Sequence, residues 1–186
     1  MKPIATETTT LECADAIIEV PAAAVRPWTD VTTHVVVAAD PAKVWTSLVF
    51  YEGIEEAPPW YLQLLLPRPI RTQGAKAAVG DQATCLYQGG HLLKRVTRID
   101  PDRRYEFTVV EQHLGIGGGI KLSGGSYVLN DLGGGRTTLS ITTRYSDGHR
   151  PRWLARPVEE AVCHLFHRHL LNAIKTKAEL PPPIAP

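Results

Sequence analysis

The chain has 186 residues, 44% of them hydrophobic and 21% charged, and a formal net charge of +1. This length and apolar fraction are typical of one globular domain and exclude extensive intrinsic disorder. The near-neutral charge argues against a nucleic-acid-binding protein, which needs a large local excess of basic side chains.

The cysteines and the N-terminal segment favour a cytoplasmic protein. Cys13, Cys85 and Cys163 are odd in number, lie far apart and form no CxxC pair, which argues against a disulfide scaffold and a zinc knuckle. Residues 1–12 are polar and contain no apolar stretch of signal-peptide length. The longest apolar run, residues 60–66, is far shorter than the roughly 20 residues of a membrane-spanning helix.

The first third of the chain predicts an extension, one strand and two short helices. Residues 1–30 show no clear periodicity, so we interpret them as an N-terminal extension. The β-branched run over residues 31–39 predicts a strand. Asp40 and Pro41 then predict a helix start, because aspartate is a favoured N-cap and proline is tolerated in the first turn. A second short helix is predicted over residues 60–66.

The middle of the chain predicts six short strands separated by turns rich in glycine, proline and aspartate. They cover residues 69–73, 81–88, 91–99, 104–113, 120–130 and 136–145. Because the connections are short, neighbouring strands are expected to pair antiparallel. Gly124 and Gly125 fall inside a strand and indicate a bulge or sharp bend. In strand 91–99 the pattern leaves open whether Leu92 or Leu93 faces inward.

A long helix is predicted from Pro157 to Leu180, followed by a proline-rich tail over residues 181–186. Proline suits the first turn, and the helix begins with acidic and ends with basic side chains, as the helix dipole favours. Its apolar stripe, at about 100° per residue, comprises Leu154, Val158, Ala161, Val162, Leu165 and Ala173. With no repeat and no second boundary, residues 31–180 form the predicted domain.

Three stretches of the sequence resemble the START/Bet v1-like superfamily, also described as polyketide cyclase/dehydrase-like (SRPBCC) proteins. They are VVVAADPAKVWTSL, RIDPDRRYEF and YVLNDLGGGRTTLSITTRY, and the resemblance covers about residues 31–180. It implies an α+β helix-grip fold. In that fold a curved antiparallel β-sheet wraps around a long C-terminal helix, with two short helices after the first strand. None of these motifs is catalytic, so they indicate the fold better than the function.

The resemblance implies an internal cavity, in which members of the superfamily bind lipids, sterols, polyketides or other apolar molecules. Our leading hypothesis is that the chain binds a hydrophobic small molecule or lipid between sheet and helix, without covalent chemistry or a cofactor. The alternative is a cyclase, aromatase or dehydratase acting on a polyketide-like carbonyl substrate. A third hypothesis is an interaction module whose cavity is filled by side chains. The oligomeric state is left open.

The candidate ligand contacts are side chains on the inward faces of the predicted strands and long helix. They are Tyr87, Tyr105, Phe107, Val109, Glu111, His113, Leu139, Ile141, Tyr145, Leu165 and His169. Continued alternation would place Glu111 and His113 beside Phe107, unless both lie on a solvated rim. His169 lies in the apolar stripe and should face the cavity, as a hydrogen-bonded core histidine or as a general base. The enzyme hypothesis needs it to transfer a proton together with Glu111, His113 or Tyr145.

Glu160, His164 and His167 have the i, i+4, i+7 spacing of a helical metal site. Their face lies opposite the apolar stripe, and the sequence offers no fourth ligand. We therefore interpret it as a solvated polar face and predict no metal site.

Arginines surround Trp153 at the start of the long helix. Beside an exposed tryptophan, Arg150, Arg152 and Arg156 could dock on anionic lipid headgroups and give a transient contact with a membrane surface. The competing interpretation is that Trp153 packs into the core where the helix begins.

Overall fold

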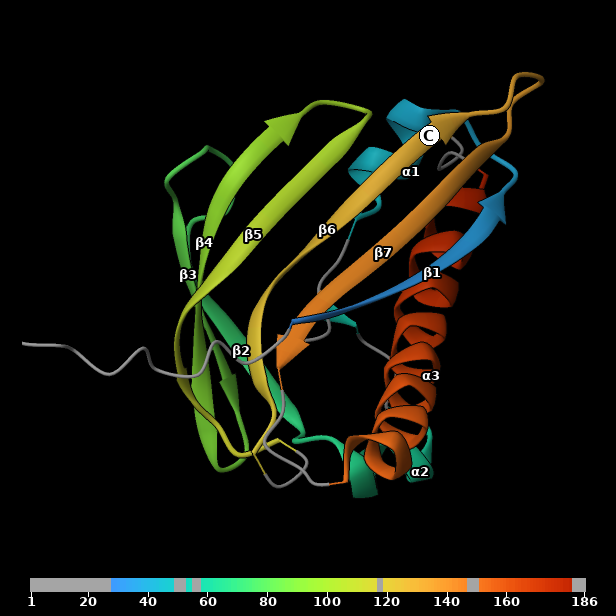
Figure 1. The fold of residues 1–186 in the computed structure, drawn as a ribbon. Coiled ribbons are helices and arrows are strands. Elements are labelled where there is room, and N and C mark those ends of the chain that lie inside the picture. The colour runs from blue at the N-terminus through green and yellow to red at the C-terminus, as the bar shows by residue number, and fades with distance from the viewer. Residues whose placement is uncertain (1–27, 49–52, 55–57, 117–118, 147–150, 182–186) are drawn as a thin grey trace, which may run out of the picture.

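A computed structural model describes residues 28–48, 53–54, 58–116, 119–146 and 151–181 (Figure 1). Within these ranges the chain forms one antiparallel sheet and three helices. The elements are β1 (Thr29–Val37), α1 (Pro41–Thr46), α2 (Trp60–Leu65), β2 (Pro69–Gly74), β3 (Gln82–Tyr87), β4 (Gly90–Asp100), β5 (Arg104–His113), β6 (Lys121–Asp131), β7 (Thr137–Ser146) and α3 (Arg152–Glu179). The predicted α+β helix-grip architecture is confirmed. Most of the predicted extension and of the proline-rich tail lies outside the described residues.

The strands follow the order β1-β7-β6-β5-β4-β3-β2, so the first strand pairs with the last. Consecutive strands from β2 to β7 pair antiparallel, as the short connections predicted, and the pairing of β1 with β7 is antiparallel as well. The sheet curves strongly, and α3 lies alongside β1 with α2 next to its N-terminal end (Figure 1). None of the helices in the described ranges is long and apolar enough to cross a membrane.

The helix starts follow from proline chemistry, with one difference from the prediction. Asp40 occupies the N-cap position of α1 with an extended backbone and Pro41 the first turn, as expected, although the Asp40 side chain makes no capping hydrogen bond. In contrast, α3 begins at Arg152 rather than at Pro157, with Pro151 in the N-cap position. The helix therefore starts five residues earlier than the sequence indicated, and Pro157 lies inside it, in the second turn.

Irregularities in β4 and β6 shape the inward face of the sheet. The pairing of β4 with β5 steps from Val96–Phe107 to Arg98–Glu106, which leaves Thr97 as an extra residue. Such a bulge reverses the alternation beyond it, so Leu92, Val96 and Ile99 all face inward and the ambiguity of this strand is resolved. The predicted irregularity of β6 is confirmed by a register shift between Leu122 and Gly124.

The densest packing involves the C-terminal half of α3. Buried side chains there contact α1, β1 and the beginning of β7. They include Leu171, Ile174 and Ala178 on the helix, Val37 and Val44 opposite, and Leu139 on β7. The packing is fixed by polar contacts, since Lys175 Nζ donates to Val36 O at 3.0 Å and Ala38 N donates to Glu179 Oε1 at 2.8 Å.

Candidate functional site

A cavity of about 610 Å³ lies between the concave face of the sheet and the N-terminal half of α3. Its walls are mainly aliphatic and aromatic, and include Leu92, Phe107, Ile141, Val162 and Phe166. The volume lies within the roughly 300–1,000 Å³ of typical small-molecule sites.

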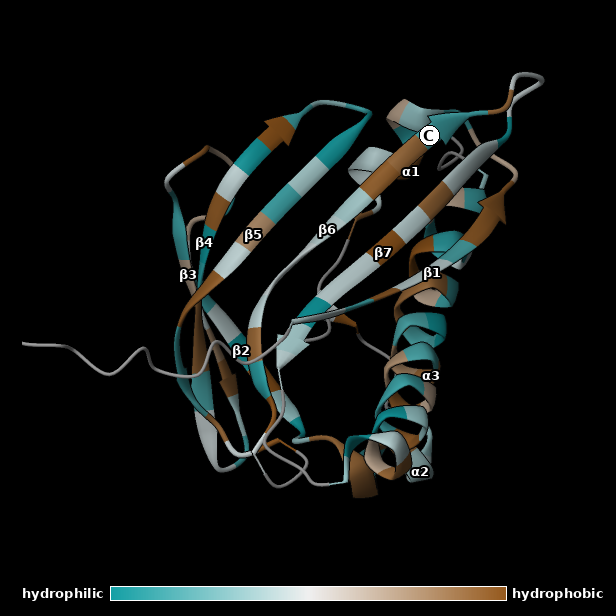
Figure 2. Cartoon of the chain, viewed as in Figure 1, coloured by the Kyte–Doolittle hydropathy of each residue, from teal (hydrophilic) through white to brown (hydrophobic). Residues whose placement is uncertain are grey.

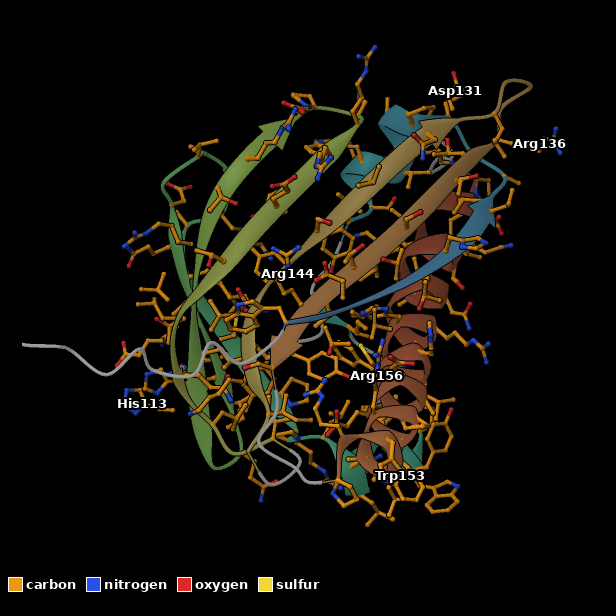
Figure 3. All side chains as sticks on the ribbon, in the orientation of Figure 1. His113, Asp131, Arg136, Arg144, Trp153 and Arg156 are labelled. Atoms are coloured by element: carbon orange, nitrogen blue, oxygen red, sulfur yellow. The ribbon has the colours of Figure 1, made fainter. Side chains whose placement is uncertain are left out.

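The cavity opens beside α2 and the first turns of α3. Leu65, Leu154 and Val158 line it and are exposed at the same time, so they form its mouth. The surrounding surface is also apolar: Trp60 and Leu64 are exposed, and Trp153 is 77% exposed. We refer to Trp60, Leu64, Leu65, Trp153, Leu154 and Val158 as the apolar rim. Figure 2 shows the hydrophobic character of α2, and Figure 3 shows Trp153 at this end of α3.

The exposure of Trp153 decides between the two interpretations of its segment. The side chain does not pack into the core where the helix begins, so that interpretation was wrong. Arg152 and Arg156 flank it, with Arg156 Nε donating to Glu160 Oε1 at 2.6 Å and Arg152 Nη2 to Thr29 Oγ1 at 3.1 Å. Arg150 lies outside the described residues.

Five of the predicted ligand contacts line the cavity. They are Tyr87 on β3, Phe107 and Val109 on β5, and Ile141 and Tyr145 on β7. These positions lie where the strands keep the regular alternation that the sequence pattern assumes.

Glu111 and His113 face the outer side of the sheet, which corrects their predicted placement. The register of β5 on β4 pairs Val109 with Lys94 and Glu111 with Leu93, so Val110 is an extra residue. This bulge reverses the alternation, and Gln112 instead of Glu111 points inward. The Gln112 amide bridges the gap to β6: its Nε2 donates to Ile120 O at 2.9 Å, and Leu122 N donates to its Oε1 at 2.9 Å.

Tyr105 and Leu139 belong to the core rather than to the cavity wall. Leu139 is fully buried. Tyr105 packs edge-to-face on Trp45, and its hydroxyl donates to Lys76 O at 2.9 Å. Burial raises the pKa of Tyr105 to about 12, so it stays protonated.

Leu165 and His169 are half-buried on α3 but do not line the cavity, contrary to the prediction. The helix is rotated so that Val162, Phe166 and Leu170 face the cavity. Apolar residues occur on several sides of α3, so the pattern could not fix this rotation. The proposed catalytic group of His169 with Glu111 or His113 is therefore not assembled in the cavity.

The cavity wall also carries charged side chains that were not among the predicted ligand contacts. Lys94 and Glu159 are the charged residues that line it in the described part of the chain. Lys94 Nζ lies 5.2 Å from the centroid of the Phe107 ring, within the range of a cation–π contact. Lys94 shares the inward face of β4 with Leu92 and Val96, a direction that the pattern of this strand left open, and the rotation of α3 places Glu159 on the wall.

A buried hydrogen-bond network borders the cavity behind α3. His167 is 0% exposed, and its Nδ1 lies 3.0 Å from Thr33 Oγ1 while its Nε2 lies 2.8 Å from Thr143 Oγ1. Thr33 Oγ1 also lies 2.7 Å from Nδ1 of His164. The predicted solvated face was therefore wrong, since His167 packs between α3, β1 and β7.

Burial sets the protonation states of this network. It lowers the pKa of His167 to about 4, with a smaller contribution from the neighbouring His164. Burial likewise raises the pKa of Cys163, on the cavity wall, to about 12. At neutral pH the imidazole is neutral and the thiol is protonated, so Cys163 is not poised as a nucleophile.

Comparisons with known proteins identify the fold and nothing finer. No family model and no curated protein matches the sequence. Among solved structures, the chain is similar to the Zhui aromatase/cyclase from a Streptomyces species, with 20% identity and a TM-score of 0.58, covering 82% of this chain and 94% of that one. It is also similar to truncated norcoclaurine synthase from Thalictrum flavum, with 12% identity and a TM-score of 0.58, covering 84% of this chain and 97% of that one.

The chain adopts the helix-grip fold of the START/Bet v1-like (SRPBCC) proteins, as its sequence motifs indicated. Both similar proteins carry enzyme names, but identities of this size show the common fold alone.

Proposed function

We propose that the chain binds a hydrophobic small molecule or lipid in the 610 Å³ cavity, without covalent chemistry. The apolar cavity itself carries the proposal. Because the cavity opens at its mouth, an empty cavity leaves its apolar wall in contact with water, which costs about 25 cal/mol per Å² of wall relative to a buried wall. A ligand that fills the space recovers part of this cost.

The few polar groups on the cavity wall suit a ligand that is mostly apolar and has one polar group at its end. Lys94 presents a cation beside the Phe107 ring, which suits a carboxylate or enolate oxygen. Thr143 adds a hydroxyl group on β7, which also lies 2.8 Å from His167 Nε2. Cavities that bind apolar ligands commonly combine such walls with a few polar groups that fix orientation.

Native mass spectrometry of the purified protein tests the proposal first, because a co-purifying molecule raises the mass above that of the 20.4 kDa chain. Titration with a fluorescent fatty acid then measures binding directly. We expect saturable binding, with emission shifted as the probe leaves water.

A matched pair of variants tests whether the probe binds inside the cavity. Val109 lines the cavity, whereas its neighbour Val110 is 45% exposed on the outer face of β5. We expect Val109→Trp to reduce probe affinity at least tenfold by filling the cavity, and Val110→Trp to leave it unchanged. Equal affinities of the two variants would refute binding in this cavity.

The enzyme alternative predicts a different outcome of the same experiments. Tyr145 and Glu159 are proton-transfer groups on the wall that an acid–base mechanism could use. An enzyme would release a chemically altered molecule from a polyketide-like substrate. Recovery of every added compound unchanged, together with tight binding, supports a binding protein.

A transient membrane contact through the apolar rim extends the proposal. The two exposed tryptophans of the apolar rim, with Arg152 and Arg156 in the first turns of α3, match the aromatic and cationic groups that favour membrane interfaces. We expect sedimentation with phosphatidylserine vesicles, and its loss in a Trp60→Ala, Trp153→Ala double variant. No sedimentation of the wild type would refute the contact and leave cavity binding untouched. A cytoplasmic location stays a prediction from the sequence.

A further inference from the structure

The outer face of the sheet brings together, from two neighbouring strands, three side chains of types that can bind a metal ion. His91 is directly opposite His113 in the β4–β5 register, and Glu111 lies two residues before His113 on the same face. The ligand atoms of the three all lie within 4.8 Å of one another. Figure 3 shows His113 on the outside of the sheet, on the far side from α3.

The backbone explains why these residues meet. The Val110 bulge turns both Glu111 and His113 outward, and without it they would face the interior. Gly90 allows the two strands to approach closely, because a Cβ at that position would lie 1.8 Å from His113 O. The result is that the imidazoles of His91 and His113 stack, with ring centroids 4.8 Å apart and planes inclined by 29°. Glu111 Oε1 contacts Nε2 of His113.

We infer that His91, Glu111 and His113 form a binding site for a late first-row divalent cation, such as Zn²⁺. Two imidazole nitrogens and one carboxylate oxygen are a donor set that such cations prefer, whereas Mg²⁺ and Ca²⁺ prefer oxygen ligands. In tetrahedral zinc coordination the donors lie about 3.3 Å apart, given metal–ligand bonds of about 2.0–2.1 Å. The three side chains reach this spacing by small rotations, because the Glu111 and His113 side chains are exposed.

The position of the site leaves at least one coordination position open to water. It is separate from the ligand cavity, since the same strands present Leu92 and Val109 to the cavity from their other face. The inference therefore does not depend on the proposed function.

Isothermal titration of the untagged protein with ZnCl₂ near neutral pH tests the site, with MgCl₂ as the comparison. We expect one zinc ion per chain, and affinity at least tenfold lower in His91→Ala and in His113→Ala. Glu111→Gln should also weaken binding. His34→Ala is the matched control, because His34 is an exposed histidine on β1, and should bind as the wild type does.

Nuclear magnetic resonance of the histidine rings provides a readout that does not depend on affinity. Zinc should shift the imidazole signals of His91 and His113 and leave that of His34 unchanged. The inference is overturned if the wild type binds no zinc, or if a His91→Ala, His113→Ala double variant that unfolds at the wild-type temperature binds zinc as tightly as the wild type.

Discussion

The two halves of α3 have different surroundings, although they belong to one continuous helix. The C-terminal half packs against α1 and β1, with Leu171, Ile174 and Ala178 fully or almost fully buried. The N-terminal half borders the cavity, and its residues Leu154 and Val158 are exposed at the mouth. Stability is therefore concentrated in one half, and surface available to a ligand in the other.

His167 stands where the two halves meet. It lies on the buried side of the helix, yet its partners Thr143 and Cys163 line the cavity. We therefore expect substitutions in the C-terminal half of α3 to change the free energy of unfolding, and substitutions in its N-terminal half to change ligand affinity.

Truncation in the packed half should have the largest effect. We expect Ile174→Ala to lower the free energy of unfolding by about 2–5 kcal/mol, because Ile174 is 0% exposed and its loss leaves a cavity. Val158→Ala, at the mouth, should change it by less than about 0.5 kcal/mol. Urea denaturation followed by circular dichroism measures both. Equal losses would contradict the division of α3 into two functional halves.

Acid should destabilise the protein through His167. The folded protein keeps this imidazole neutral down to a pKa of about 4, while the unfolded chain takes up a proton near the ordinary value of 6.5. The contribution of the neutral His167 ring to the free energy of unfolding is therefore complete above pH 6.5. It falls as the pH decreases toward 4, by about 3 kcal/mol in total.

The variant His167→Gln removes this titration and provides the reference. We expect the stability difference between wild type and variant to shrink by that amount from pH 6.5 to pH 4. Urea midpoints at several pH values measure it. A difference that does not depend on pH would show that the buried ring does not titrate as its surroundings require.

Most of the fold could be predicted from the sequence because the residues that begin helices and separate strands act locally. Asp40 and Pro41 mark a helix start, and glycine-rich turns separate strands whose antiparallel pairing follows from short connections. On regular strands, alternation also placed Tyr87, Ile141 and Tyr145 on the inward face, where they line the cavity.

The rest of the site depends on geometry that alternation does not encode. One extra residue at Val110 moves Glu111 and His113 to the outer face and creates the proposed metal site. The rotation of α3 is decided by packing on β1, which removes His169 from the cavity wall and buries His167. Neither the Val110 bulge, which has no glycine, nor the rotation of α3 has a strong local signal in this sequence.

The link between β1 and α3 should contribute less than the packed core. Thr33→Val removes the hydroxyl that hydrogen-bonds both His164 and His167, and should cost about 1–2 kcal/mol because His167 is buried. Thr32→Val is the matched control: Thr32 bonds Thr142 on the exposed face, so its loss should cost less than about 0.5 kcal/mol. A similar cost for both would mean that the buried network does not fix the helix on the strand. Thermal and urea unfolding of the two variants decide this.

The smallest expected effect comes from a substitution in the cavity wall, and it changes ligand affinity instead of the free energy of unfolding. Lys94 lines the cavity beside Phe107, so Lys94→Met keeps the apolar stem and removes the charge. Competition experiments should show about tenfold weaker binding of a fatty acid, or about 1.4 kcal/mol, and unchanged binding of the alcohol of equal chain length. If both ligands weaken equally, Lys94 contributes packing alone and does not orient the ligand. If only the binding of the fatty acid weakens and the urea midpoint of unfolding stays the same, then the cavity wall affects ligand affinity without affecting stability. This is the division of roles that the packed and cavity-lining halves of α3 predict.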